Sequence, residues 1–106
     1  MATKLGEKIR ALRLEKELTL EALALRAGLS KSYLWELENR ESQRPSAEKM
    51  QGLADQLGVD VSYFLDDSVD QAQEAHVDKQ FFRNYSKLAP DDKERLRLIL
   101  ETFKRK

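Results

Sequence analysis

Residues 19–39 read TLEALALRAGLSKSYLWELEN, and this stretch decides the fold. Thr19 is a residue type that caps helices, and leucine and alanine recur after it at helical spacing. Gly28 follows, where glycine commonly adopts the left-handed conformation that ends a helix. Only Leu29 separates it from Ser30, a second capping residue. The stretch therefore predicts two short helices joined by a tight turn.

Helical signals continue on both sides of this stretch. Apolar positions over residues 5–17 predict a helix before it. After it, Ser46 begins a helix that Gly58 ends, and a short helix from Ser62 closes the core. Two helices joined by such a turn form a helix-turn-helix. We expect an all-α protein with a five-helix domain over residues 1–66.

The sequence changes character twice beyond this domain. Residues 67–73 are polar and predict a linker, and apolar periodicity then resumes over residues 74–106. Pro90 is followed by two acidic residues, which suits the first turn of another helix. We therefore expect a C-terminal helical hairpin.

One apolar stripe runs along this hairpin and has two interpretations. It folds back on the helix-turn-helix of its own chain, or it pairs with a second copy. Two short amphipathic helices bury little between themselves and need a further surface. We expect a homodimer whose interface consists of Val77, Phe81, Phe82, Tyr85, Leu96, Ile99, Leu100 and Phe103.

The composition limits the class of protein. Glycine and proline are scarce, at 4 and 2 of 106 residues, which is typical of a helical globular protein. The absence of cysteine excludes disulfides and thiolate metal sites and suits the cytoplasm. No apolar run approaches the roughly 20 residues that span a bilayer, so we expect no membrane association.

The charge balance alone does not indicate a nucleic-acid partner. The chain has 19 basic and 19 acidic residues, with 10 of each in residues 1–65 and 9 of each in residues 66–106. Proteins that bind nucleic acid often carry an excess of basic residues. Any field that attracts DNA must therefore come from the separation of charges onto one face.

Several spaced motifs occur in one order along the chain. They are Ile9 to Arg13 (IRALR), Thr19 to Ala24 (TLEALA), Ala27 to Leu34 (AGLSKSYL), Glu38 to Arg40 (ENR), Arg44 to Ser46 (RPS) and Leu57 to Leu65 (LGVDVSYFL). From Ile9 to Asp66, about half of the chain resembles the Cro and phage-repressor class of helix-turn-helix regulators, also called the XRE family. The resemblance implies a phage-repressor-like fold and a transcriptional regulator that binds double-stranded DNA.

In this family the third helix enters the major groove. Carried over by position, the resemblance makes Lys31, Ser32 and Glu36 the main candidates for base contacts. Lysine donates to guanine, serine pairs with several bases, and glutamate accepts from cytosine. Glu36 has the alternative of an ion pair with Lys31 or Arg40. Relatives often have glutamine at positions 31 and 32, so the preferred base sequence does not carry over.

Two aromatic residues of the same helix have open interpretations. Trp35 either contacts DNA or packs at the domain edge, and packing is favoured because large aromatic side chains usually bury surface. Tyr33 has the same alternatives, with a hydroxyl that can reach a phosphate.

The resemblance also implies residues that touch no base. Helix N-termini and basic side chains suit phosphate, and the implied phosphate contacts are Thr19, Leu20, Asn39, Arg40, Arg44 and Ser46. Arg13 is expected to pair with Glu38, which fixes the angle of the third helix.

Three classes of function remain to be compared. We expect a repressor that acts as a homodimer on an operator with inverted half-sites. The alternative is an antitoxin-like or antagonist-controlled protein, with Phe81, Phe82 and Phe103 facing a toxin or antagonist. An enzyme is not expected, because no nucleophile–base set, phosphate-binding glycine loop or metal-ligand cluster is present. We expect no cofactor and no metal, and a solvated side chain for the single histidine, His76.

Overall fold

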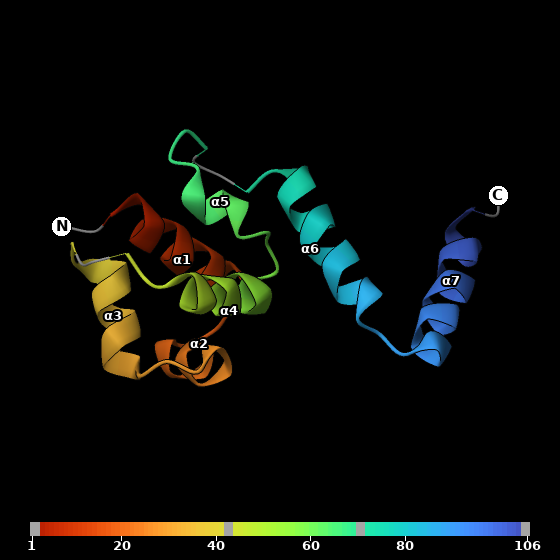
Figure 1. The fold of residues 1–106 in the computed structure, drawn as a ribbon, viewed down its shortest axis with the longest axis horizontal. Coiled ribbons are helices and arrows are strands. Elements are labelled where there is room, and N and C mark those ends of the chain that lie inside the picture. Colours follow the sequence, from red (N-terminus) through yellow and green to blue (C-terminus); the bar gives the residue numbers. More distant parts are fainter. Residues whose placement is uncertain (1–2, 42–43, 70–71, 105–106) are drawn as a thin grey trace.

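The structure is a computed structural model that describes residues 3–41, 44–69 and 72–104. Residues 70 and 71 of the expected linker lie outside these ranges. All regular structure in the described ranges is helical, with the helices α1 (Lys4–Glu15), α2 (Leu20–Ala27), α3 (Lys31–Asn39), α4 (Ala47–Leu57), α5 (Ser62–Leu65), α6 (Glu74–Ser86) and α7 (Pro90–Lys104). Figure 1 shows α1 to α5 gathered into one body and α6 and α7 extending from it. The expected all-α fold is confirmed.

The predicted capping residues begin the helices of the motif. The Thr19 hydroxyl accepts a hydrogen bond from the Ala22 N–H at 3.0 Å, and Ser30 accepts one from the Tyr33 N–H at 3.1 Å. Gly28 has φ 72°, the left-handed conformation that ends α2. These local signals set the turn between α2 and α3 and therefore the point at which α3 begins.

The core receives at least one fully buried side chain from each of the first five helices. These side chains are Ile9, Leu23, Leu34, Leu53 and Phe64, each 0% exposed. Full burial of such a side chain contributes about 1.5–3 kcal/mol. The core therefore holds the inner face of α3 and leaves its outer face to solvent.

The helices α1 and α3 approach closely at Gly6. A methyl group at Gly6 would overlap the carbonyl oxygen of Leu37, so only glycine fits this contact. Because Leu37 lies on the inner face of α3, this close approach helps to fix the position of α3 on the domain.

The first helix ends earlier than the sequence predicts. We expected it to reach Glu17, but α1 ends at Glu15. Glu17 has φ 56°, which is uncommon for a residue other than glycine, and the Leu18 N–H donates to the Arg13 carbonyl oxygen at 3.0 Å. The chain therefore turns away from the helix at Glu17, and no glycine in the sequence signals this helix end.

The helix α6 is attached to the first domain through polar contacts. Gln80 is 1% exposed, and its Nε2 donates to Asp55 Oδ1 of α4 at 2.8 Å. The Asp60 N–H donates to the carbonyl oxygen of His76 at 3.0 Å. These contacts join the first half of α6 to α4 and to the segment between α4 and α5.

His76 is not the solvated side chain that the sequence suggested. Its ring is half-buried, with its centroid 5.4 Å from that of Tyr63. Its Nδ1 accepts a hydrogen bond from the Gln73 N–H at 2.9 Å. The histidine therefore takes part in capping the N-terminus of α6.

The apolar stripe of the C-terminal helices faces solvent in this single chain. Figure 1 shows α6 and α7 diverging from their connecting turn, with α7 away from the first five helices. Phe81, Phe82 and Phe103 are 61%, 69% and 78% exposed. The interpretation that the stripe folds back on its own helix-turn-helix is therefore wrong for this conformation. Within the described ranges, no helix combines the length and the apolar character that a bilayer span requires.

Candidate nucleic-acid interface

The outer face of α3 carries the side chains that we expected to read bases. Leu34 and Leu37 are buried on the inner face, whereas Lys31, Ser32 and Glu36 are exposed. This division follows from the helical period of 3.6 residues, which places residues three or four positions apart on the same face of the helix. The candidates are therefore free to meet a ligand that approaches α3 from solvent.

Side-chain contacts link the first turn of α3 to the first turns of α2 and α4. Lys31 Nζ of α3 donates to Glu21 Oε1 of α2 at 2.8 Å. Lys49 Nζ of α4 lies 4.5 Å from the centroid of the Tyr33 ring of α3. The N-terminus of a helix carries a partial positive charge and unsatisfied N–H groups that attract anions. Three such ends therefore border one surface.

The expected phosphate contacts lie at helix ends and in the segment after α3. Thr19 and Ser46 are exposed caps of α2 and α4, and Leu20 is half-buried at the start of α2. Arg40 and Arg44 are exposed in the segment that follows α3, whose residues 42 and 43 lie outside the described ranges. Asn39 is half-buried, and its Nδ2 donates to the Trp35 carbonyl oxygen at 2.9 Å. All six candidates are thus at helix ends or in the segment after α3, and the Asn39 amide is engaged within α3.

The ion-pair alternative for Glu36 is wrong. Lys31 pairs with Glu21 instead. Lys31 and Glu36 point in different directions, because positions 31 and 36 lie about 140° apart around a helix with 3.6 residues per turn. Arg40 has extended backbone, with φ −127° and ψ 157°, and its guanidinium lies 5.2 Å from the Trp35 ring centroid. Glu36 is therefore exposed with no ion pair in the described part of the chain.

The two aromatic residues of α3 each carry a cation on the ring. Trp35 is 42% exposed, and the Arg40 guanidinium lies over its ring. Tyr33 is half-buried beneath Lys49. Cations over aromatic rings are attracted by the negative face of the ring. Lys49 was missed by sequence reasoning, because only the tertiary fold brings it to Tyr33.

Arg13 and Glu38 form the pair that the resemblance implies. Arg13 Nε lies 2.8 Å from Glu38 Oε2, Nη2 lies 2.9 Å from Oε1, and Nη1 donates to the Leu18 carbonyl oxygen. Glu38 is 2% exposed. A two-pronged pair of this kind has a fixed geometry. It joins α1 to the last turns of α3 and thereby restrains the angle of α3.

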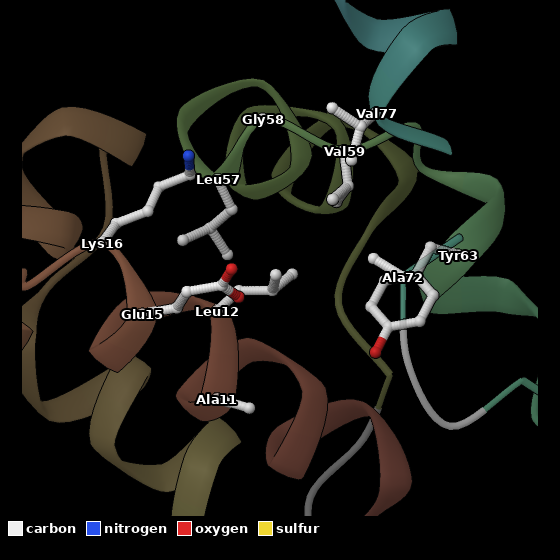
Figure 2. Close-up of a pocket in the computed structure, with 10 residues that line it drawn as sticks. All are labelled: Ala11, Leu12, Glu15, Lys16, Leu57, Gly58, Val59, Tyr63, Ala72 and Val77. Atoms are coloured by element: carbon white, nitrogen blue, oxygen red, sulfur yellow. The ribbon is translucent and has the colours of Figure 1, made fainter. Parts of the chain in front are cut away.

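A separate cavity of about 570 Å³ lies between the first domain and α6. Figure 2 shows Lys16 at the C-terminal cap of α1, Leu57 of α4, Tyr63 of α5 and Val77 of α6 around it. None of the residues expected to contact DNA lines this cavity. The candidate interface is therefore the solvent-facing surface of α3 and not an enclosed pocket.

Comparison with known proteins agrees with this geometry. A family model described as Helix-turn-helix matches residues 9–64, which is more than half of the chain. The chain belongs to this helix-turn-helix family. The matched range ends within α5, so it contains the motif and most of the core that supports it.

Two relatives of this helix-turn-helix protein are regulators. The immunity repressor protein of Bacillus phage phi105 is 42% identical over 57 residues, which are 54% of this chain and 39% of the repressor. The HTH-type transcriptional regulator SinR of Bacillus subtilis (strain 168) is 32% identical over 87 residues, which are 82% of this chain and 75% of SinR. The expectation of an XRE-type transcriptional regulator, and not an enzyme, is confirmed.

Two solved structures of SinR match different lengths of the helix-turn-helix protein. One, of SinR as the master regulator for biofilm formation in complex with DNA, has a TM-score of 0.56 and 35% identity. That match covers 58% of this chain and 98% of the other chain. The SinR–SinI protein complex has a TM-score of 0.59 and 26% identity, and covers 94% of each chain. The second likeness therefore extends over the C-terminal helices.

Proposed function

We propose that this chain is a sequence-specific repressor that binds double-stranded DNA as a homodimer on an inverted-repeat operator. The observation that carries the proposal is the outer face of α3, which presents Lys31, Ser32 and Glu36 to solvent beside three helix N-termini. The likeness to SinR in complex with DNA supports it.

In this proposal α3 lies in the major groove. Lys31 donates to guanine, Ser32 contacts a neighbouring base, and Glu36 accepts from a cytosine amino group. Tyr33 and Trp35 contact the sugar–phosphate backbone or a thymine methyl group. The phosphates are held by Thr19, Leu20, Asn39, Arg40, Arg44 and Ser46, which set the register of the protein on the duplex.

The proposal divides the chain into a DNA-binding domain of residues 1–66, a linker of 67–73 and a dimerisation hairpin of 74–106. The exposed stripe on α6 and α7 supports dimerisation, because exposed apolar patches of this kind mark interaction surfaces. A two-fold dimer brings two copies of α3 about 34 Å apart, the spacing of successive major grooves.

A second candidate function uses the same apolar surface differently. In it an antagonist or toxin protein covers α6 and α7 and competes with the second copy. The likeness to SinR in the SinR–SinI complex, which extends over these helices, favours this candidate. The two candidates are compatible when the antagonist acts by separating the dimer.

The proposal is tested by two substitutions with different expected effects. Lys31→Ala should weaken binding to the preferred duplex by about 1–3 kcal/mol and relax the preference at one base position. Arg44→Ala should weaken binding to all duplexes alike and reduce the slope of log K against log salt by about 0.9. Fluorescence anisotropy with the preferred duplex and a scrambled duplex, at several salt concentrations, measures both.

The comparison between the two variants decides the assignment of base contacts. If Lys31→Ala weakens binding to both duplexes by the same factor, Lys31 contacts phosphate and the proposed base contact is wrong. If neither variant changes binding, the surface around α3 is not the DNA interface.

A further inference from the structure

The ion pair between Lys31 and Glu21 joins the first turns of the two helices of the motif. Lys31 Nζ lies 2.8 Å from Glu21 Oε1, and the side chains are 59% and 72% exposed. Ion pairs exposed in this way contribute only about 0–1 kcal/mol to stability. The pair is therefore of little consequence for folding, and its effect lies in where it places the lysine ammonium.

The cations around α3 differ in how firmly they are held. Lys31 is paired with Glu21, Lys49 lies over Tyr33, and Arg40 lies over Trp35. Arg44 is exposed and has no partner among residues 3–41, 44–69 and 72–104. Arg44 is thus free to follow a phosphate, whereas the Lys31 ammonium lies beside the Glu21 carboxylate.

We propose that Glu21 is a specificity-determining residue, which holds the Lys31 ammonium toward base edges and away from phosphates. The inference rests on the proposed function, because it requires Lys31 to read a base. Glu21 acts through Lys31 and is therefore a positioning residue.

The chemistry of the lysine allows this arrangement. An ammonium group has three donors, so it can keep one hydrogen bond to Glu21 while it gives others to guanine O6 and N7. A phosphate is a second anion, and bringing it to the same ammonium places it beside the Glu21 carboxylate. Repulsion between the two anions disfavours the phosphate contact, whereas the neutral guanine edge meets no such repulsion.

The charge state of Glu21 supports this role. The hydrogen bond from Lys31 and, next, its positive charge hold the pKa of Glu21 below its usual range. The carboxylate is therefore ionised throughout the pH range in which binding to DNA is measured.

The test replaces Glu21 with glutamine, which keeps the shape and removes the charge. With Lys31 released to neutralise a phosphate, Glu21→Gln should tighten binding to a scrambled duplex about threefold to tenfold and steepen its salt slope by about 0.9. The preference for guanine at the Lys31 position should fall by about fivefold or more. Both are measured by fluorescence anisotropy on the full chain, with duplexes that differ at that position.

Glu48 offers a matched control. It is the second residue of α4 as Glu21 is of α2, it is exposed, and it has no ion pair among the described residues. Glu48→Gln should leave the guanine preference unchanged. If both substitutions change the preference by the same factor, only net charge matters and the inference is overturned.

A double substitution tests whether Glu21 acts through Lys31. In the Lys31→Ala background, Glu21→Gln should no longer change the guanine preference, because the two residues form one unit. An undiminished effect would overturn the inference.

The wild-type protein separates failure of this inference from failure of the proposed function. If the wild type prefers one duplex and Glu21→Gln keeps that preference in full, only the role of Glu21 is wrong. If the wild type binds all duplexes equally, the proposed function is wrong and the role of Glu21 falls with it.

Discussion

The two regions of this chain use similar amphipathic helices with opposite results. The helices α1 to α5 bury their apolar faces against one another, and Leu34 of α3 is 0% exposed. The helix α7 has no buried residue in its described length, and Phe103 is 78% exposed. The first region therefore completes its own core, whereas the second leaves its apolar surface exposed to solvent.

The boundary between these regions is polar. Gln80 donates to Asp55, and Lys79 Nζ lies 3.9 Å from Asp60 Oδ2. Gln80 Oε1 is buried and has no hydrogen-bond partner among the described residues. A polar contact with an unsatisfied atom contributes little to stability. The attachment of α6 is therefore weaker than the packing within the first five helices.

The largest expected effect comes from truncating a phenylalanine in each of the two regions. Phe64→Ala should lower the free energy of unfolding by about 3–5 kcal/mol, because it leaves a cavity in the core. Phe103→Ala, at an exposed position, should change the stability of the monomer by less than about 0.5 kcal/mol. Urea unfolding at low protein concentration measures both. Equal losses would contradict the division into a closed and an open region.

Removal of the buried ion pair should have the next largest effect. Arg13→Ala leaves the buried Glu38 carboxylate without its partner, which should cost about 3 kcal/mol in the free energy of unfolding. The exposed pair offers a control, since Lys31→Ala should cost less than about 1 kcal/mol. If the two losses are the same, Glu38 is not confined by the fold as the structure indicates.

The apolar stripe is tested by charges placed in it. Phe81→Asp combined with Ile99→Asp should give a monomer by sedimentation, with the unfolding free energy of the monomer changed by less than about 0.5 kcal/mol. Leu25→Asp is the control, because Leu25 is 83% exposed on α2, outside the stripe. A dimer that survives the double substitution would exclude the stripe as its interface.

The smallest expected effect is a pH dependence at the boundary of the regions. Hydrogen bonds from the Ser62 side chain, and then its backbone, hold the pKa of Asp60 below its usual value, although burial acts in the opposite direction. The charged form therefore stabilises the folded state above the unfolded pKa of about 4, and this contribution is lost as the pH falls through the folded pKa. Asp60→Asn should flatten the decrease in melting temperature below pH 4. An unchanged decrease would show that other carboxylates cause it.

The sequence predicts the fold well where the signals are local. The caps at Thr19, Ser30 and Ser46 and the glycines 28 and 58 bound the helices as predicted, because each acts within one turn of the chain. The outward position of Lys31 and Ser32 follows from helical periodicity alone.

The remaining features depend on contacts between distant segments. Lys31 meets Glu21, and Lys49 meets Tyr33, only because the tertiary fold brings these side chains of different helices together. No periodicity links these positions, so the sequence offered Glu36 as the partner of Lys31 instead. The role of Gly6 likewise depends on the tertiary fold, which brings α1 against the Leu37 carbonyl group.

The most direct measurement is selection of duplexes from a randomised pool by the purified protein at about physiological salt, followed by sequencing. We expect an inverted repeat whose half-sites are centred about 10 base pairs apart, which requires both base reading by α3 and a two-fold dimer. Retention of all sequences alike, or of none, would contradict the proposal that this protein alone reads an operator.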